Sequence, residues 1–274
     1  MTPNLLTIAG SDPSGGAGIQ ADLKTFSALG GYGMAAITAL TAQNTQGVTC
    51  IHHVPADFVR LQIQTIFDDI RVDAVKIGMG GSVETVAVIA DVLEKNKPPI
   101  IVLDPVMIAQ SGDALLTDAE ILALKEKLLP LATIITPNLP EAEVLLGRKI
   151  DEPAGAAQAL LAFAPAVLLK GGHADGARSD DILATQDMLI TLDAPRIDTK
   201  NNHGTGCTLA AALAAYLAQG LSLREAARRA KHYITQALQH SGQLSVGHGH
   251  GPVHHFWNRS PRTNSTSSKN ISRR

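Results

Sequence analysis

The chain has 274 residues, of which 45% are hydrophobic, 18% charged and 3% aromatic, and its formal net charge is −2. That length and composition suit one large or two small globular domains, and the scarcity of aromatic side chains disfavours a nucleic-acid stacking platform. Two cysteines make no disulfide framework, and neither a signal peptide nor a membrane-spanning apolar run is apparent. We therefore expect a cytoplasmic protein with neither a nucleic-acid nor a membrane partner.

Short apolar runs alternate with amphipathic helical patterns along the chain. The predicted strands are residues 5–9, 34–40, 73–78, 99–104, 132–136 and 166–170. The predicted helices are 17–29, 56–70, 83–95, 118–129, 206–219 and 223–240, with further helices around the last two strands. Continuous apolar strands between amphipathic helices predict an α/β protein with a mostly parallel sheet covered on both faces.

Residues 1–257 show no fixed repeat and no linker, so we expect a single domain. The last residues, 258–274, read "NRSPRTNSTSSKNISRR" and carry five basic residues and no acidic ones. This basic segment has almost nothing to bury and is predicted to be disordered. Ser222 and Glu225 have the spacing of a capping box at the start of the last helix. The helix at 56–70 carries Phe58, Leu61, Ile66 and Phe67 as its apolar residues.

Polar and glycine-rich segments follow several predicted strands. In open parallel sheets, ligands bind beyond the carboxyl ends of the strands. The residues at those ends are Gly10–Gly18, Gln43, Asp104, Asn138, Glu141 and Lys170. Their convergence on one edge predicts a binding site there.

The first of these segments, "GSDPSGGAG" (10–18), has the Walker A glycine spacing, but Gly16-Ala17 stands where Lys-Ser/Thr is required. It also lacks the dinucleotide spacing Gly-x-Gly-x-x-Gly. What remains is a strand, a glycine turn and a helix whose backbone can approach a small ligand. Asp22, one turn into that helix, is either a solvated acid or a ligand contact.

Other polar positions also have two interpretations. Asn138 and Glu141 can cap a helix together, or leave a carboxylate near a metal-bound phosphate. Asp104 before Pro105 can cap a turn or help to hold Mg²⁺. The histidines of "VGHGHGPVHH" (246–255) lie among glycines in a loop without acidic or thiol partners, and no metal site is expected there.

The two cysteines differ in setting. Cys50 is interpreted as a small core residue, and the neighbouring His52 and His53 as surface residues. Cys207 lies in "NHGTGCTLAAALAAYLAQG" (202–220), where a glycine turn opens a helix. Unpaired N–H groups and the helix dipole make such a turn suitable for an anion. The alternative is a tight turn followed by a small buried cysteine.

Taken together, several motifs resemble one known family. They are "AGSDPSGGAGIQADLKTFSALG" (9–30), "TALTAQNTQGV" (38–48), "VKIGM" (75–79), "VLDPVM" (102–107), "TPNLPEAEVLL" (136–146), "LLKGGH" (168–173), "TKNNHGTGCTLAAAL" (199–213) and "VGHGHGPVHH" (246–255). In this order, from Asn4 to Phe256, they resemble the bacterial hydroxymethylpyrimidine/phosphomethylpyrimidine kinases of thiamine biosynthesis. These kinases form a branch of the ribokinase-like superfamily.

The resemblance implies a three-layer α/β/α fold, a homodimer and two successive ATP-dependent phosphorylations. The first acts on the hydroxymethyl group of 4-amino-5-hydroxymethyl-2-methylpyrimidine (HMP), and the second on the phosphate of the product. By motif, the pyrimidine would lie among Gly10, Asp22, Gln43, Met79, Val106 and Cys207. ATP would lie by Asn138, Lys170 and Thr199, with Mg²⁺ near Asp104 and Glu141. Gln43 offers the donor and the acceptor that an aminopyrimidine edge requires.

The resemblance also suggests how the glycine turn acts. The amides of Gly204, Thr205, Gly206 and Cys207 would form an anion hole for the γ-phosphoryl group, with Lys170 as a further catalytic residue. Sugar kinases of the superfamily carry Asp as general base where Cys207 stands. A thiol at a helix N-terminus has a lowered pKa, so a Cys207 thiolate could take that role, or Cys207 could chiefly shape the pocket.

Four other functions are alternatives to the pyrimidine kinase. A pyridoxal or pyridoxine kinase on the same fold is the nearest alternative, because pyridoxal also carries a hydroxymethyl group on a six-membered nitrogen heterocycle. The missing Asp disfavours a sugar kinase. A non-catalytic pyrimidine-binding regulator would not need an anion hole, and a nicotinamide oxidoreductase would need the dinucleotide glycine spacing.

Overall fold

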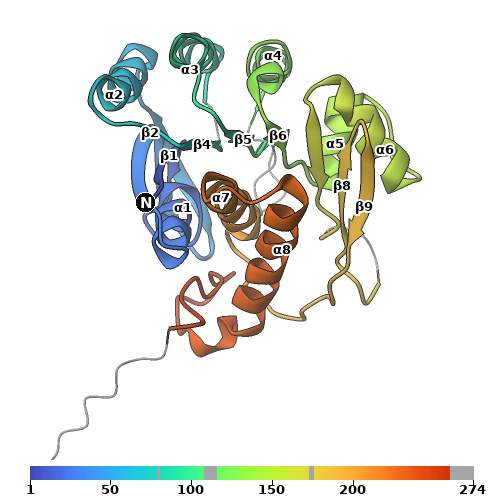
Figure 1. Cartoon of the computed structure of the whole chain (residues 1–274). Coiled ribbons are helices and arrows are strands. Elements are labelled where there is room, and N and C mark those ends of the chain that lie inside the picture. Colours follow the sequence, from blue (N-terminus) through green and yellow to red (C-terminus); the bar gives the residue numbers. More distant parts are fainter. Residues whose placement is uncertain (79–80, 108–115, 173–175, 260–274) are drawn as a thin grey trace, which may run out of the picture.

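The computed structural model describes residues 1–78, 81–107, 116–172 and 176–259. Within them one sheet has the strand order β3-β2-β1-β4-β5-β6-β7-β8-β9 (Figure 1). Its strands are β1 (Asn4–Ser11), β2 (Tyr32–Asn44), β3 (Gly47–His53), β4 (Ala74–Ile77), β5 (Ile101–Leu103), β6 (Ile134–Ile135), β7 (Ala166–Leu169), β8 (Asp181–Thr185) and β9 (Met188–Leu192).

The centre of the sheet, from β2 through β7, is parallel, as the sequence predicted. Its edges are antiparallel: β3 pairs with β2, and β8 and β9 follow β7 as antiparallel strands. These three edge strands were not predicted. Almost every residue of β3 is exposed and β9 alternates between exposed and half-buried residues, so neither produces the continuous apolar run of a buried strand.

The helices cover both faces of the sheet and make the expected three layers (Figure 1). One face carries α2 (Ala56–Asp69), α3 (Val83–Asn96), α4 (Asp118–Ala123), α5 (Leu139–Leu146) and α6 (Pro153–Ala159). The other face carries α1 (Gly18–Ala28), α7 (Thr205–Ala218) and α8 (Leu223–Gln239). The predicted helix 118–129 is interrupted, because α4 continues as a wider π-helical turn. The short helical turns are η1 (Leu124–Leu128), η2 (Leu129–Leu131), η3 (Leu160–Ala162) and η4 (Ser241–Gln243).

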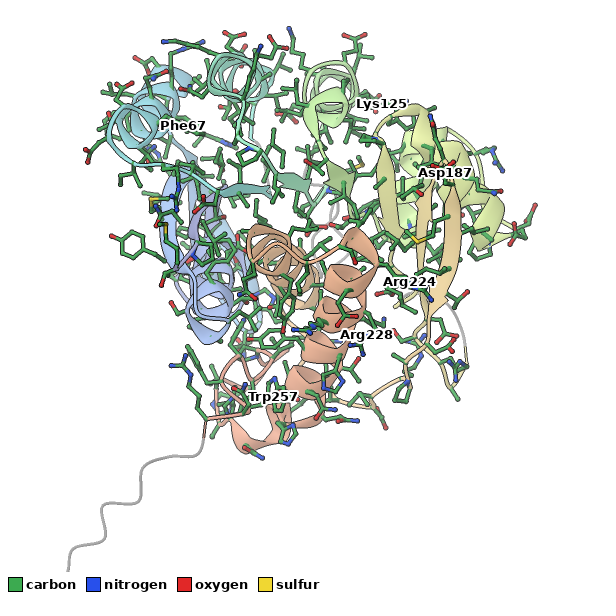
Figure 2. The ribbon with its side chains drawn as sticks, viewed as in Figure 1. Phe67, Lys125, Asp187, Arg224, Arg228 and Trp257 are labelled. Atoms are coloured by element: carbon green, nitrogen blue, oxygen red, sulfur yellow. The ribbon has the colours of Figure 1, made fainter. Side chains whose placement is uncertain are left out.

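Helix α7 lies in the middle of the second layer. Its alanines and leucines are buried all round because α7 packs on the sheet, α1 and α8, as expected of a helix with apolar residues on every side. Helix α8 instead turns its arginines outwards, and Trp257 closes its lower end, where the indole stacks on the His240 ring with centroids 5.6 Å apart (Figure 2). The buried part of α7 begins at Thr208, and the first turn before it is only partly buried.

Several local predictions were wrong. Cys50 lies exposed on β3 rather than in the core, because β3 is an edge strand. On α2, Phe58 and Leu61 are exposed, and the face that packs on the sheet presents Val59 and Ile63.

The predicted capping box of α8 was partly wrong. The Ser222 side chain caps α8 as predicted, but Glu225 binds Arg228 and Arg229 instead of completing the capping box. Arg259, in the segment predicted to be disordered, is exposed, and its guanidinium donates to the carbonyl of Ser27 at 3.0 Å. Residues 260–274 of that tail lie outside the described residues. No helix in the described ranges has the length and apolarity to cross a membrane.

Candidate active site

The carboxyl ends of the parallel strands bring a lysine and two carboxylates together. Lys170 follows β7 and Asp104 follows β5, and the Lys170 Nζ lies 2.6 Å from the Asp104 Oδ1. The same oxygen accepts a hydrogen bond of 2.9 Å from the hydroxyl of Thr136, which follows β6. The Lys170 Nζ also lies 3.8 Å from the Glu141 Oε2. The predicted convergence at this edge is thus confirmed for these three charged residues.

Asn138 and Glu141 form the capping box that the sequence allowed. The Asn138 side chain accepts from the Glu141 amide, and the Glu141 Oε2 accepts from the Asn138 amide at 2.8 Å. Capping fixes the Glu141 carboxylate beside Lys170. The two interpretations of this motif are therefore compatible, because the same geometry that caps α5 also leaves a carboxylate at the site.

The charges at this edge shift one another's pKa values. Burial alone would raise the pKa of Asp104, but the charges of Lys170 and Lys76 outweigh it and lower that pKa. Burial raises the pKa of Glu141 to about 7; the Lys170 charge opposes this rise and the Asp104 charge adds to it. Lys170 stays cationic, because Asp104 and Glu141 raise its pKa against the effect of burial.

A glycine turn at the start of α7 faces this charged cluster. Gly204 is the N-cap of α7, with a φ of 78° that favours glycine. A Cβ placed on Gly206 would lie 3.2 Å from the Lys170 Nζ and 3.3 Å from the Asp104 Oδ2. The N-terminus of α7 therefore meets Lys170 and Asp104 at one point. Such an arrangement can hold a phosphate together with its counter-charge.

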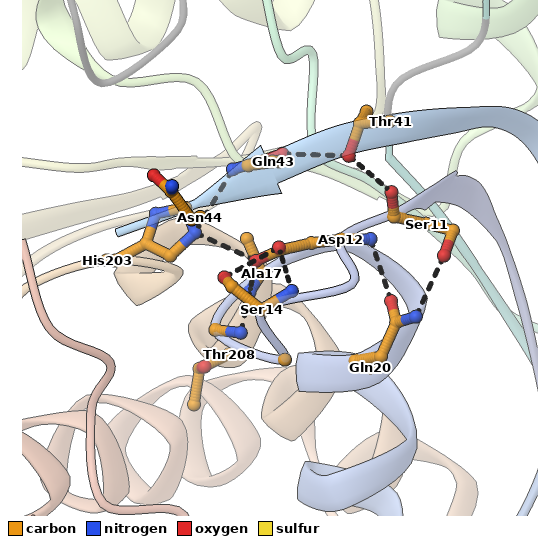
Figure 3. Close-up of polar contacts among 12 residues, drawn as sticks. Ser11, Asp12, Ser14, Ala17, Gln20, Thr41, Gln43, Asn44, His203 and Thr208 are labelled. Carbon is orange, nitrogen blue, oxygen red and sulfur yellow. Dashed lines mark hydrogen bonds and ion pairs between the residues drawn. The ribbon is translucent and has the colours of Figure 1, made fainter. Parts of the chain in front are cut away.

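The first glycine-rich loop packs against that turn through backbone. A Cβ on Gly204 would overlap the carbonyl of Gly16, so the two loops touch without an intervening side chain. Asp12 organises the first loop: its carboxylate accepts from the amides of Gly16 and Ala17 and from the Ser14 amide and hydroxyl (Figure 3). The sequence analysis missed Asp12, although its place in a glycine-rich turn is one that favours Asp.

Below the loops lies a buried ion pair that the sequence analysis only half identified. Asp22 is completely buried and its Oδ2 lies 2.9 Å from the Lys76 Nζ and 2.6 Å from the Thr7 hydroxyl. The other oxygen of Asp22, Oδ1, is buried without a partner among the described residues. This position excludes the solvated acid that the sequence allowed. Lys76, inside the apolar strand β4, was not predicted as a site residue.

Cys207 lies close enough to this pair for its charges to act on the thiol. Burial raises the pKa of Cys207, and the Lys76 charge opposes that rise. The helix N-terminus led us to expect a lowered pKa for Cys207, and that expectation was wrong, because the loss of water around the sulfur raises the pKa more than the Lys76 charge lowers it. At neutral pH the group is a thiol.

The remaining predicted residues are placed as follows. Gln43 is half-buried on β2, with its amide 3.3 Å from His203. Val106 is partly buried after β5, and Gly10 is buried near the carboxyl end of β1. The Thr199 hydroxyl contacts that of Ser241 at 3.1 Å and accepts from the Asn201 amide, so its place beside ATP stays a prediction. Met79 lies outside the described residues.

A second buried ion pair supports the backbone next to Lys170. The Asp181 Oδ1 accepts from the Gly171 amide at 2.9 Å and lies 2.8 Å from the Lys231 Nζ. Burial raises the pKa of Asp181, and Lys231 opposes the rise. This pair, which the sequence did not reveal, anchors the end of β7 to α8.

The fold is a mostly parallel sheet between two layers of helices, and a helix N-terminus, a lysine and a carboxylate meet at the carboxyl edge of the sheet. This combination defines a ribokinase-like kinase. The solved structures it resembles include a phosphomethylpyrimidine kinase from Clostridium difficile 630 (45% identity, TM-score 0.78, covering 86% of this chain and all of that one). They also include a Staphylococcus aureus pyridoxal kinase in complex with AMP-PCP and pyridoxal (37% identity, TM-score 0.86, covering 94% of this chain and 96% of that one).

The sequence comparisons identify the family within the ribokinase-like kinases. A Rhizobium meliloti relative described as hydroxymethylpyrimidine/phosphomethylpyrimidine kinase is 53% identical over 261 residues, covering 93% of this chain and 98% of the relative. The family model "Phosphomethylpyrimidine kinase" matches residues 12–254. The chain belongs to the phosphomethylpyrimidine kinase family.

Proposed function

We propose that the protein uses ATP to phosphorylate HMP to HMP phosphate and then HMP phosphate to HMP diphosphate, in thiamine biosynthesis. The observation that carries this proposal is the meeting of Gly206, Lys170 and Asp104 at one point, because phosphoryl transfer depends chiefly on positioning and charge neutralisation. We place the activity in the cytoplasm, where ATP is made and where the two unpaired cysteines stay reduced.

In the first reaction, the hydroxymethyl oxygen of HMP attacks the γ-phosphorus of ATP. The new P–O bond forms as the bond to the β,γ-bridging oxygen breaks, ADP leaves, and the hydroxyl proton is released. In the second reaction a phosphate oxygen of HMP phosphate is the nucleophile. The first turn of α7, from Gly204 to Cys207, would bind the transferring group through its amides, and Lys170 would neutralise its charge.

The pyrimidine would lie on the other side of that turn. We place it among Gly10, Asp22, Gln43, Met79, Val106 and Cys207. The Asp22 Oδ1 is buried with no partner among the described residues, and this supports the placement, since a buried acceptor calls for a donor. Cys207, held as a thiol, would face the hydroxymethyl group and shape the pocket rather than take up the hydroxyl proton.

ATP would lie by Asn138, Lys170 and Thr199, with Mg²⁺ near Asp104 and Glu141. Mg²⁺ often binds through one or two carboxylates together with substrate phosphates. The donor set fits this pattern, because the described residues contain two carboxylates beside Lys170 but no group of three or more His, Cys, Asp or Glu side chains placed around one ion. When bound, Mg²⁺ would supply positive charge to the phosphates.

We further propose that the protein is a homodimer. Three apolar side chains of the β2–β3 hairpin, Leu40, Val48 and Ile51, are exposed, and a second copy would cover them. Light scattering coupled to gel filtration tests this, with Ile51→Lys expected to shift a dimer to a monomer.

The test of function is ATP consumption with HMP, HMP phosphate and pyridoxal offered separately, with products resolved by mass. Conversion of HMP through the monophosphate to the diphosphate would support both reactions. Pyridoxal kinase is the second candidate, because the TM-score with the S. aureus pyridoxal kinase, 0.86, exceeds the 0.78 found with the C. difficile enzyme. Turnover of pyridoxal alone would favour it, and binding of HMP without turnover of any compound would favour a regulator.

A further inference from the structure

His203 joins three segments that are far apart in the sequence. Its Nε2 lies 2.9 Å from the Asp12 Oδ2 in the first glycine-rich loop and 3.3 Å from the side-chain amide of Gln43 on β2 (Figure 3). Its backbone amide donates to the carbonyl of Gly251 at 3.0 Å. It is also the residue before Gly204, the N-cap of α7. A single imidazole thus connects both glycine-rich loops to the strand that carries Gln43.

The protonation of this ring follows from its neighbour. Burial alone would raise the pKa of Asp12, but hydrogen bonds from His203, Ser14 and Ala17 lower it to about 2. An ionised carboxylate accepts hydrogen bonds and donates none. The Nε2 of His203 therefore carries a proton and donates it to Asp12.

That proton determines how Gln43 is oriented. A ring nitrogen that carries hydrogen has no lone pair in the ring plane, so the end of the Gln43 amide that faces it must be the carbonyl oxygen. The other end lies 3.1 Å from the Thr41 hydroxyl, which is also 2.9 Å from the carbonyl of Ser11. Because a backbone carbonyl only accepts, Thr41 gives its one proton to Ser11 and accepts from the Gln43 NH₂.

The two ends of an amide have the same shape and are told apart by their hydrogen bonds. With the Gln43 oxygen towards the Nε2–H that His203 shares between Asp12 and Gln43, and the NH₂ towards Thr41, no two donors and no two acceptors face each other among these residues. This is the reverse of the orientation drawn in Figure 3. One lone pair and one N–H of Gln43 then remain for a ligand, in positions that the network fixes.

We propose that His203 is a positioning residue that sets the orientation of the Gln43 amide in the pyrimidine pocket, so that an aminopyrimidine meets its donor and acceptor in the right order. This inference rests on the proposed function. His203 touches Gln43 rather than the substrate, so its removal acts on pyrimidine binding through a side chain that is no longer held. Releasing one such side chain costs about 1 kcal/mol of binding, or roughly fivefold in affinity.

The kinetic test compares His203→Ala, His203→Gln, Gln43→Ala and the double variant His203→Ala/Gln43→Ala. We expect His203→Ala to raise the KM for HMP roughly fivefold with little change in kcat, in the KM for ATP or in the melting temperature. His203→Gln, which can still donate to Asp12 and to Gln43, should recover most of the loss. In the double variant, the KM for HMP should be close to that of Gln43→Ala alone. The control His248→Ala, at an exposed histidine, should leave both KM values unchanged.

Additive effects of the two single variants would overturn the proposal, as would an equal rise in the KM for ATP or a failure of His203→Gln to recover binding. A substrate-free measurement separates this inference from the proposed function. In ¹H–¹⁵N NMR spectra, the Gln43 NH₂ signals should move more in Thr41→Val than in His203→Ala, because Thr41 accepts from that group. If the Gln43 NH₂ signals move more in His203→Ala than in Thr41→Val, the proposed amide orientation is rejected, even if the enzyme phosphorylates HMP. If the wild-type protein neither binds nor phosphorylates HMP, the proposed function is rejected but the orientation is not.

Discussion

Lys170 and Asp104 form an ion pair, with the Lys170 Nζ 2.6 Å from the Asp104 Oδ1, at the carboxyl edge of the sheet, where β7 and β5 end on either side of β6. A lysine and an aspartate buried at a sheet edge cost desolvation energy that the pair alone does not clearly recover. We propose that a ligand supplies the difference, by bringing negative charge to the lysine and a cation to the carboxylates.

Replacing Lys170 with methionine keeps the length of the side chain and removes its charge. We expect kcat to fall by about 10²–10³, the cost of losing one charge-stabilising donor in such a site. The control is Lys149→Met, whose partner Glu143 lies on the surface, and which should keep full activity. Steady-state kinetics with HMP measures both, and a loss below tenfold for Lys170→Met would remove Lys170 from the catalytic residues.

The glycine turn can be tested with a matched pair of glycines in and after α7. Gly206→Ala places a methyl group against Lys170 and Asp104 and should reduce kcat at least about tenfold, while the gain in helix propensity keeps stability nearly unchanged. Gly220 has a φ of 85° and open space around it. Gly220→Ala should therefore cost about 1 kcal/mol of stability and leave kcat intact. Equal kinetic damage in both variants would contradict the placement of the phosphate.

The pKa of Glu141, raised to about 7 by burial, predicts how Mg²⁺ binding depends on pH. Since the metal binds the ionised carboxylate, the apparent Mg²⁺ affinity should rise as pH increases towards about 7 and level off above it. Glu141→Gln should bind Mg²⁺ more weakly and lose this pH dependence. Titration of Mg²⁺ against activity at several pH values measures it, and a flat profile for the wild type would place the metal elsewhere.

The same raised pKa affects the stability of the metal-free protein. The folded state holds a proton on Glu141 at pH values where the unfolded chain has released it, so the free energy of unfolding should fall as pH rises from about 4.5 to about 7. Denaturant unfolding without Mg²⁺ measures this slope. Glu141→Gln should flatten it.

Burial keeps Cys207 protonated, so Cys207→Ala should lower kcat by less than about tenfold. Loss of a general base would lower kcat by about 10²–10⁴-fold. Its effect should fall mainly on the KM for HMP, since we place the sulfur in the pyrimidine pocket. Loss of turnover with unchanged HMP binding would instead identify Cys207 as the base.

Removing Lys231 tests the second buried ion pair. Lys231→Met leaves Asp181 without its partner and should lower the free energy of unfolding by about 3 kcal/mol at neutral pH. The loss should shrink at acidic pH, where Asp181, whose pKa burial raises, takes up a proton. Urea unfolding at two pH values measures this, and Asp181→Asn/Lys231→Met should be less damaging than Lys231→Met alone.

The sequence predicted the parallel core of the fold because β1, β4 and β5 are continuous apolar runs between amphipathic helices. It did not predict β3 at one edge or β8 and β9 at the other. The residues of β3 are almost all exposed and those of β9 alternate in exposure, so neither is a continuous apolar run. The pairing of an edge strand is also set by its neighbour rather than by its own composition.

At the site, the sequence predicted residues that follow strands, such as Asp104 and Lys170, because topology alone brings strand ends together. It missed Lys76 and His203. Lys76 lies within an apolar strand, and its role depends on Asp22, which is distant in sequence. His203 gains its role from hydrogen bonds across the fold that no local spacing encodes.

The backbone contact between Gly16 and Gly204 also governs when the kinase becomes active during its own synthesis. The first loop emerges from the ribosome among the earliest segments, and its partner emerges only after all nine strands described have been made. A nascent chain can therefore assemble most of its sheet before the glycine turn at Gly204, on one side of the proposed nucleotide site, has been synthesised. If the turn at Gly204 binds the transferring phosphate as we propose, a chain that ends before it lacks those amides, and they arrive with the last two long helices.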